Sequence, residues 1–266
     1  MKRRLFVKAS LLTSSLSSLE PIMSLGSQDS EEQKKSREFY ELRVYSLKNE
    51  TQQKIVEDYF QNAAIPAFNR FGSKNIGVFR EQKPTENIKL YVLIPFPSLS
   101  DFLKVQQKLS KDEVYNAAGM AYLDSPASAP AYERIESSLF HAFSQMPRLE
   151  VPEKKTRIFE LRRYESSGES AGKKKIEMFD AGGEIRIFKK VGLTPVFFGE
   201  SLIGPSRPNL TYMLTFDDMA EHDRNWKLFG SDPEWKRISA MPEYADAKIV
   251  SRIVSTFLIP TDFSQI

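Results

Sequence analysis

The chain has 266 residues, of which 41% are hydrophobic and 12% aromatic, so it can bury the core of one large domain or of two ordinary ones. Its formal net charge of +3 comes from the amino-terminal end, because residues 1–26 hold four basic residues and one acidic residue while the remainder holds 34 of each. This balance excludes the basic surface of a nucleic-acid-binding domain. The absence of cysteine excludes disulfides, thiol catalysis and thiolate metal sites.

The amino-terminal residues have the pattern of a protein-export signal. Residues 2–8 (KRRLFVK) carry two adjacent arginines followed by apolar residues and a lysine, which resembles a twin-arginine export signal of bacteria. Residues 9–19 are only mildly apolar and rich in serine, too short and too polar to span a bilayer stably. We expect cleavage after Gly26, a disordered tail at residues 27–37, and a periplasmic or secreted protein without a stable membrane anchor. The alternative is a basic, disordered amino-terminal tail.

Hydrophobic periodicity predicts strands and helices in turn along the first half of the chain. Its long helix contains Pro66, which predicts a kink, and ends at Gly72 as a C-cap. Ser98 is expected to be the N-cap of a later helix. The expected elements are a strand at 38–46, a helix at 51–71, strands at 76–80 and 89–96, helices at 98–109 and 111–118, and a strand at 132–143. This order, β-α-β-β-α-β, is that of a ferredoxin-like unit.

The second half repeats this order after a linker at residues 146–155. Gly192 is expected to cap its long helix, Asp217 or Asp218 to begin a later one, and Pro233 to lie in the first turn of another, where proline is tolerated. The expected elements are a strand at 157–164, a helix at 172–191, strands at 195–200 and 210–216, a helix at 218–229, a helix from 233, and a strand at 248–258.

The two halves also repeat in sequence, at a spacing of about 120 residues. Three stretches of the first half, 39–45 (FYELRVY), 65–72 (IPAFNRFG) and 112–115 (DEVY), match 158–164 (IFELRRY), 185–192 (IRIFKKVG) and 232–235 (DPEW) of the second. We therefore predict an α+β fold of two tandem ferredoxin-like (βαββαβ) repeats, at 38–145 and 156–260. Because each sheet needs cover for its second face, the two would pack together as a pseudo-dimeric α/β barrel.

A polar stripe repeats on the first strand of each half. Every second residue of a strand faces the same way. In the first half the apolar face carries Tyr40, Leu42 and Val44, and we assign it to the helices. The opposite face carries the pattern Glu-x-Arg-x-Tyr, and we assign it to the space between the two sheets, where a pseudo-twofold site would form. The stripe consists of Glu41, Arg43 and Tyr45 in the first half and Glu160, Arg162 and Tyr164 in the second.

These residue types could bind and polarise a small anion or a carbonyl group. Arginine supplies planar hydrogen-bond donors, tyrosine a proton donor and glutamate a base. The candidate catalytic residues are Glu41, Glu160, Tyr45 and Tyr164, and the candidate ligand-binding residues are Arg43, Arg162, Trp226, Trp235 and His222. The alternative is structural: buried glutamate and arginine need each other simply to be tolerated. The two interpretations are not exclusive.

The remaining candidates have ordinary interpretations beside functional ones. Trp226 and Trp235 suit helix packing first and the wall of a pocket mouth second. His222 suits an exposed helix position or acid–base chemistry. His141 lies in the other half and neither histidine has a His-x-x-x-His partner, so we expect no metal site and no cofactor, with a single axial haem histidine left open. Residues 173–175 (KKK) suit a solvated helix face rather than a phosphate-binding track.

Three segments of the second half carry a family resemblance. Residues 159–164 (FELRRY), 188–192 (FKKVG) and 223–235 (DRNWKLFGSDPEW) together resemble the NIPSNAP family, and the resemblance extends over residues 37–260. It implies a dimeric α/β-barrel fold, from a superfamily that includes cofactor-independent monooxygenases, haem enzymes and stress-responsive barrels. The family offers no well-established catalytic residues, and the trafficking and mitophagy roles of its mitochondrial members are not expected of an exported bacterial protein.

The sequence therefore predicts an exported barrel that binds a small organic ligand between its two sheets, with a cofactor-free oxygenase-like activity as the functional hypothesis. The alternative is a non-catalytic adaptor or oligomerisation module with a solid barrel. The expected partner is a small molecule rather than nucleic acid, and aromatic-rich strand edges leave room for a homodimer.

Overall fold

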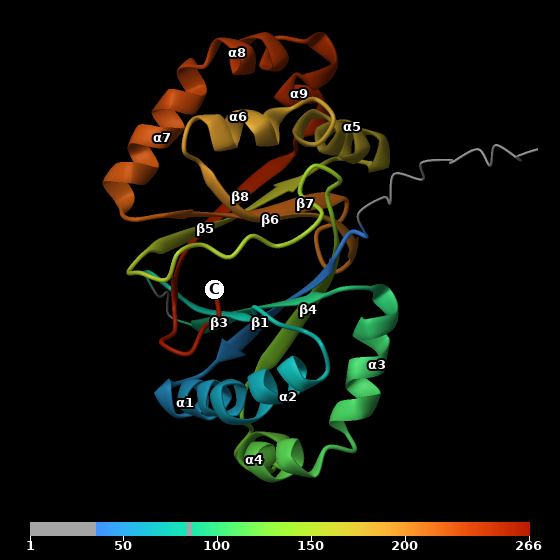
Figure 1. Cartoon of the computed structure of the whole chain (residues 1–266), viewed down its shortest axis with the longest axis vertical. Coiled ribbons are helices and arrows are strands. Elements are labelled where there is room, and N and C mark those ends of the chain that lie inside the picture. Colours follow the sequence, from blue (N-terminus) through green and yellow to red (C-terminus); the bar gives the residue numbers. More distant parts are fainter. Residues whose placement is uncertain (1–35, 84–86) are drawn as a thin grey trace, which may run out of the picture. The chain divides into compact units, whose positions relative to one another are not determined.

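The computed structural model describes residues 36–83 and 87–266 (Figure 1). The predicted signal peptide and all but the last two residues of the predicted tail lie outside the described residues. The strands are β1 (Phe39–Leu47), β2 (Gly77–Glu81), β3 (Ile88–Phe96), β4 (Arg134–Ala142), β5 (Ile158–Glu165), β6 (Thr194–Ile203), β7 (Asn209–Phe216) and β8 (Arg252–Pro260). The helices are α1 (Glu50–Tyr59), the π-helical turn η1 (Phe60–Ala64), α2 (Ile65–Arg70), α3 (Leu99–Leu109), α4 (Glu113–Leu123), α5 (Glu169–Phe179), α6 (Glu184–Lys190), α7 (Met219–Ser231), α8 (Pro233–Ser239), the 3-10 turn η2 (Pro242–Tyr244) and α9 (Asp246–Ile249).

The strands close into an antiparallel barrel in the order β1-β3-β2-β8-β5-β7-β6-β4. Each half contributes a sheet of ferredoxin-like order, β4-β1-β3-β2 from the first and β8-β5-β7-β6 from the second. The two sheets join through β2 with β8 and through β4 with β6. Helices α1 to α4 cover the first sheet and α5 to α9 cover the second (Figure 1). The predicted fold class is confirmed.

The long helices of the two halves break at different places. In the first half the helix widens to a π turn, with the Ile65 N–H donating to the Phe60 carbonyl, immediately before Pro66. Proline has no N–H for a regular helix bond, which accounts for the predicted kink. In the second half, the single helix predicted at 172–191 is wrong, because Gly183 adopts a left-handed φ of 92° and separates α5 from α6. This break places Glu184 at the buried start of α6.

The assignment of strand faces is reversed relative to the prediction. Tyr40 and Leu42 belong to the core inside the barrel, together with Phe159 and Leu161 of the second half. The stripe residues face outward, and Tyr45 packs in the core beneath the first-half helices. A closed barrel covered by helices buries both faces of each strand, so alternation separates two faces without showing which one lies inside. The middle of the barrel is filled by aromatic and aliphatic side chains, including Tyr40, Phe79, Phe140, Phe159, Phe197 and Met213.

Candidate functional site

The second half gathers its three stripe residues around one buried carboxylate. Glu160 on β5 is 1% exposed and accepts a hydrogen bond from Nη1 of Arg162 at 2.7 Å. Nη2 of Arg162 donates to the Tyr164 hydroxyl at 3.1 Å, so the stripe forms a hydrogen-bonded chain along one face of β5. From the adjacent strand β8, the Ser255 hydroxyl donates to Oε1 of Glu160 at 2.6 Å.

Helix α7 brings two more predicted residues onto this carboxylate. Nε1 of Trp226 donates to Oε2 of Glu160 at 3.1 Å, and the Arg162 guanidinium lies 4.6 Å from the Trp226 ring. Nε2 of His222 is 3.4 Å from the same oxygen, without the alignment of a hydrogen bond, and its side chain is only 14% exposed. The exposed position considered for His222 is therefore wrong. Trp235 on α8 packs against a phenylalanine of α7 and is not part of the cluster.

Three residues that were not predicted complete the cluster. Tyr212 on β7 lies opposite Arg162 and its ring stacks on that of Tyr164, with centroids 5.9 Å apart. Nζ of Lys175, on α5, is 3.9 Å from Oε2 of Glu184 and 5.2 Å from the Tyr164 ring. Lys175 is 2% exposed, so the prediction that residues 173–175 form a solvated face is wrong for this residue.

The cluster contains buried polar atoms without a hydrogen-bond partner. Among the described residues, Nε of Arg162, Oε2 of Glu184 and the Tyr212 hydroxyl have no hydrogen-bond partner. Burial raises the pKa of Glu184 to about 7, although the neighbouring Lys175 charge opposes the shift. Burial likewise holds the pKa of Tyr212 well above its usual value. Near neutral pH, Glu184 can therefore gain or lose a proton while Tyr212 keeps its own.

The corresponding cluster of the first half is fully paired. Both oxygens of Glu41 accept hydrogen bonds from Arg43, each at 2.8 Å, and the Ser137 hydroxyl donates to Oε1 at 2.7 Å. The Tyr45 hydroxyl bonds with that of Tyr122 at 3.1 Å. None of these five side chains is among the described residues that have a buried unpaired atom. The structural interpretation of the stripe thus describes this half well.

The additional polar residues of the second half have apolar counterparts in the first. Val92 lies opposite Arg43 on β3, Val56 is the seventh residue after the N-cap of α1, and Ala64 is the seventh before the C-cap of α2. The same three positions of the second half hold charged or phenolic side chains, in the pairs Tyr212–Val92, Lys175–Val56 and Glu184–Ala64. A position-by-position comparison of the two halves of the sequence could have identified Lys175, Glu184 and Tyr212 as candidate site residues.

A surface pocket of about 380 Å³ opens beside the second-half cluster. Its wall includes Ser255, whose hydroxyl holds Glu160, and Phe257, whose ring lies 5.1 Å from that of His222. The pocket therefore adjoins the Glu160 side of the cluster through Ser255 and Phe257, while Glu160 and Glu184 do not line it.

A second cavity, of about 340 Å³, lies between the two sheets at one end of the barrel. Its lining includes Tyr91, whose hydroxyl donates to Oε1 of Glu81 at 2.8 Å, and Arg163. None of the six stripe residues lines it. The predicted pseudo-twofold site between the sheets is therefore wrong as regards the stripe, because each half encloses its own stripe between sheet and helices.

The described residues give no sign of a metal centre or a membrane span. Within residues 36–83 and 87–266, no group of three or more histidines, aspartates and glutamates could hold a metal ion. His141 stacks on Phe39 with ring centroids 4.6 Å apart and pairs with Arg37 at 3.1 Å. No helix in the same ranges is long and apolar enough to cross a bilayer.

The chain resembles known proteins in both sequence and fold. It shares the fold of a "putative monooxygenase" from Fusobacterium nucleatum, at 8% identity and a TM-score of 0.56, over 85% of this chain and 93% of that one. A protein of the same description from Lactobacillus acidophilus gives 9% identity and a TM-score of 0.57, over 84% and 94%. An anthrone oxidase-like protein gives 9% and 0.51, over 86% and 93%.

At these identities the structural likeness shows the fold alone. No curated protein matches the chain in sequence. The family model described as NIPSNAP matches residues 40–143 and again residues 159–265, which together make up most of the chain. The chain therefore belongs to the NIPSNAP family, with one copy of its domain in each half of the barrel.

Proposed function

We propose that the second half binds a small acidic aromatic ligand, such as a phenol or an anthrone, and acts on it as a cofactor-free oxygenase. The observation that carries this proposal is Glu184, a buried carboxyl group with a pKa of about 7, whose Oε2 has no hydrogen-bond partner among the described residues and lies 3.9 Å from Nζ of Lys175. A catalytic base is most effective when its pKa lies near the working pH. Burying a carboxyl group in a core lowers the stability of the fold. The first half folds with Ala64 at the equivalent position, so the fold itself does not require a carboxyl group there.

The surrounding side chains suit stabilisation of an anion that forms during the reaction. Glu184 would take a proton from the ligand, and the positive charges of Arg162 and Lys175 would stabilise the anion left behind. The Tyr164 hydroxyl accepts from Arg162 and would donate its own proton to the ligand. Glu160 already accepts from three donors, which suits it to orient Arg162 rather than to accept a proton.

The ligand anion would then react with molecular oxygen. For an anthrone, the methylene carbon loses two hydrogens and gains one oxygen atom as a carbonyl group, and the second oxygen atom leaves as water. The ligand would enter from the pocket at Ser255 and Phe257 and pass Glu160 to reach Glu184. The likeness of the fold to the two monooxygenases and to the anthrone oxidase-like protein supports this reaction class without establishing it.

Oxygen uptake with 1,8-dihydroxyanthrone, in the presence of a metal chelator, tests the proposal. We expect uptake above the uncatalysed rate, and we expect Glu184→Gln to lower kcat by at least about 100-fold, the usual contribution of a general base. The matched control is Glu136→Gln, which changes a carboxylate that lines the cavity between the sheets and does not line the pocket at Ser255 and Phe257. That variant should keep its rate within about twofold.

Two results would overturn the proposal. The first is uptake no faster than in buffer, which would remove the oxygenase function. The second is loss of activity in Glu136→Gln with Glu184→Gln unaffected, which would move the chemistry to the space between the sheets. The packed middle of the barrel does not favour the adaptor alternative over this one, because the polar cluster lies outside the barrel.

We further propose that the chain is exported, on the pattern of residues 2–8 alone. Replacing Arg3 and Arg4 together by lysine should leave the protein in the cytoplasm of a bacterial host that has the twin-arginine route. Cell fractionation measures this, and unchanged export of the double variant would contradict it. Analytical ultracentrifugation of the exported protein would show whether the fused pair associates further into a homodimer.

A further inference from the structure

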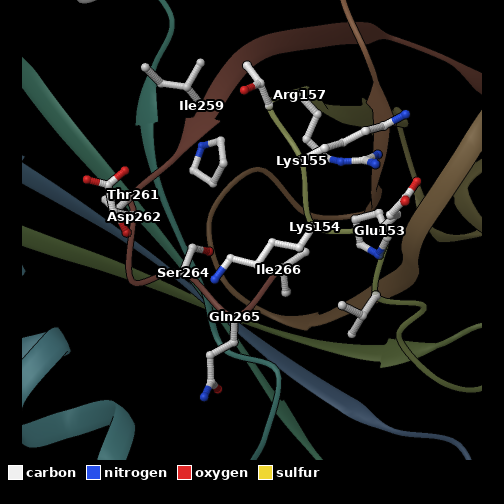
Figure 2. Close-up of a pocket in the computed structure, with 14 residues that line it drawn as sticks. Glu153, Lys154, Lys155, Arg157, Ile259, Thr261, Asp262, Ser264, Gln265 and Ile266 are labelled. Atoms are coloured by element: carbon white, nitrogen blue, oxygen red, sulfur yellow. The ribbon is translucent and has the colours of Figure 1, made fainter.

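A third cavity, of about 570 Å³, lies where the segment that joins the two halves meets the end of β8 and the segment after it (Figure 2). It is formed by residues 151–157 on one side and residues 259–262 and 264–266 on the other. Its volume is within the range of small-molecule pockets. None of the residues of the two polar stripes lines it, so it is separate from the proposed oxygenase site.

The cavity contains a buried guanidinium group without a carboxylate partner. Arg157 is 9% exposed, and among the described residues its one hydrogen bond runs from Nη1 to the Thr215 hydroxyl at 3.2 Å, while Nε has no partner. Asp217, which interacts electrostatically with Arg157, forms its ion pair with Lys155 at 2.7 Å. A buried charge is normally compensated by an opposite charge. The protein supplies none to Arg157 within ion-pair distance among its described residues.

The first half treats the equivalent position differently. Glu38 precedes β1 by one residue, as Arg157 precedes β5, and its carboxylate accepts a hydrogen bond from the Leu149 N–H at 2.8 Å. The linker therefore donates a hydrogen bond to the charged side chain of Glu38, whereas the charged side chain of Arg157 faces a cavity.

The other walls of the cavity combine free donors, apolar surface and the carboxylates of Glu153 and Asp262. Lys154 makes no hydrogen bond or ion pair among the described residues, and Figure 2 shows its side chain extending across the cavity toward Ser264. The Ser264 hydroxyl accepts from the Val78 N–H and keeps its own proton available to donate. Apolar surface comes from Val151, Pro152, Ile259, Pro260 and Ile266.

We infer that this cavity binds a small monocarboxylate with an apolar body. The carboxylate would lie against Arg157, with the charge of Lys154 adding to the attraction, and the hydrocarbon part would cover Ile259 and Ile266. A carboxylate is the best geometric match for a guanidinium group, which can donate to both of its oxygens at once. The site exists because two domains are fused, since one wall is the linker between them.

Isothermal titration calorimetry with hexanoate, octanoate and benzoate tests this inference on the full folded chain. We expect saturable binding of at least one of these acids and much weaker binding of 1-octanol, which has the apolar body without the charge. Arg157→Gln should weaken binding at least about 10-fold, the effect of losing a charged hydrogen bond, and Lys154→Ala by about threefold. The matched control is Arg163→Gln, whose guanidinium pairs with Glu165 and lines the cavity between the sheets.

Three outcomes would overturn the inference. They are the absence of saturable binding of all three acids, equal binding of octanoate and 1-octanol, and unchanged affinity in Arg157→Gln. Lys154 is exposed, so Lys154→Ala should fold normally. If Arg157→Gln does not fold, unchanged affinity in Lys154→Ala would overturn the inference instead. Because Glu184→Gln leaves this cavity intact, it should bind octanoate like the wild type even if the proposed oxygenase activity proves wrong.

Discussion

The two halves of this barrel share one backbone plan and one stripe of polar residues, but they treat the buried charges in opposite ways. In the first half, Glu41 is fully engaged by Arg43 and Ser137, and the surrounding positions are apolar. In the second half, Glu160 binds an equivalent Arg162, but Lys175, Glu184 and Tyr212 add further polar atoms. Two of these atoms, Oε2 of Glu184 and the Tyr212 hydroxyl, have no hydrogen-bond partner among the described residues. In the first half the stripe thus has a structural role, and the additional residues mark the half that has diverged.

This difference has an energetic consequence, because each buried polar group without a hydrogen-bond partner lowers the free energy of unfolding by about 1–3 kcal/mol. The first half shows that this fold is stable with paired side chains at these positions. The loss of stability in the second half therefore has no structural reason. Positions where a protein buries polar groups at a loss of stability are expected to be functional sites. Duplication lets one copy retain the stable arrangement while the other departs from it.

The largest expected effect separates the two equivalent arginines. Arg43→Ala and Arg162→Ala each leave a buried glutamate without its ion-pair partner, so each should lower the free energy of unfolding by about 3 kcal/mol or more in urea titrations. Only Arg162→Ala should also lower turnover of 1,8-dihydroxyanthrone, by at least about 100-fold. Equal loss of turnover in both folded variants would show that the halves do not differ in function.

A smaller effect should appear in the pH dependence of stability. The pKa of Glu184 is about 7 in the folded chain against a usual value of 4.5, so between these pH values the folded state holds more protons than the unfolded state. Its contribution to stability is therefore fully present below about pH 4.5 and is lost as the pH rises through about 7. The loss amounts to about 3 kcal/mol.

The measurement is the unfolding free energy of the wild type minus that of Glu184→Gln at a series of pH values. This difference isolates the one carboxyl group, because the glutamine does not titrate. It should fall between about pH 4.5 and 8. A difference that stays flat or rises over this range would mean that Glu184 is paired and charged in the folded protein.

The smallest effect compares two buried phenols. Tyr59 in the first half bonds with the Tyr115 hydroxyl at 2.8 Å, so Tyr59→Phe should lower the free energy of unfolding by about 1 kcal/mol. The Tyr212 hydroxyl has no such partner, so Tyr212→Phe should leave stability unchanged or slightly raised. Thermal unfolding of the two variants measures this, and a loss in Tyr212→Phe as large as in Tyr59→Phe would show that its hydroxyl is bonded.

Much of the fold could be predicted from the sequence, because local patterns determine it. Ser98 and Asp218 cap their helices with side-chain bonds, Pro233 begins α8, and Gly192 ends α6 with a left-handed φ of 84°. The repeat of the FELR-type strands predicted two copies of one unit, and the closed barrel follows from that.

The site could be predicted only in part, because burial in this fold depends on long-range packing. The stripe was identified, but its face was wrong, since both faces of β1 and β5 are buried. Lys175 follows two other lysines and Glu184 follows two glycines, and both contexts are typical of exposed turns and helix surfaces. Helix rotation over the sheet, which no local pattern determines, buries them together.

The most direct test of the difference between the halves is native mass spectrometry after anaerobic incubation with 1,8-dihydroxyanthrone. Without oxygen the ligand can bind but cannot react. We predict one added ligand per chain in the wild type and in Arg43→Ala, and none in Arg162→Ala. A bare polypeptide mass for the wild type, or equal loss of the ligand in both arginine variants, would contradict the assignment of function to the second half.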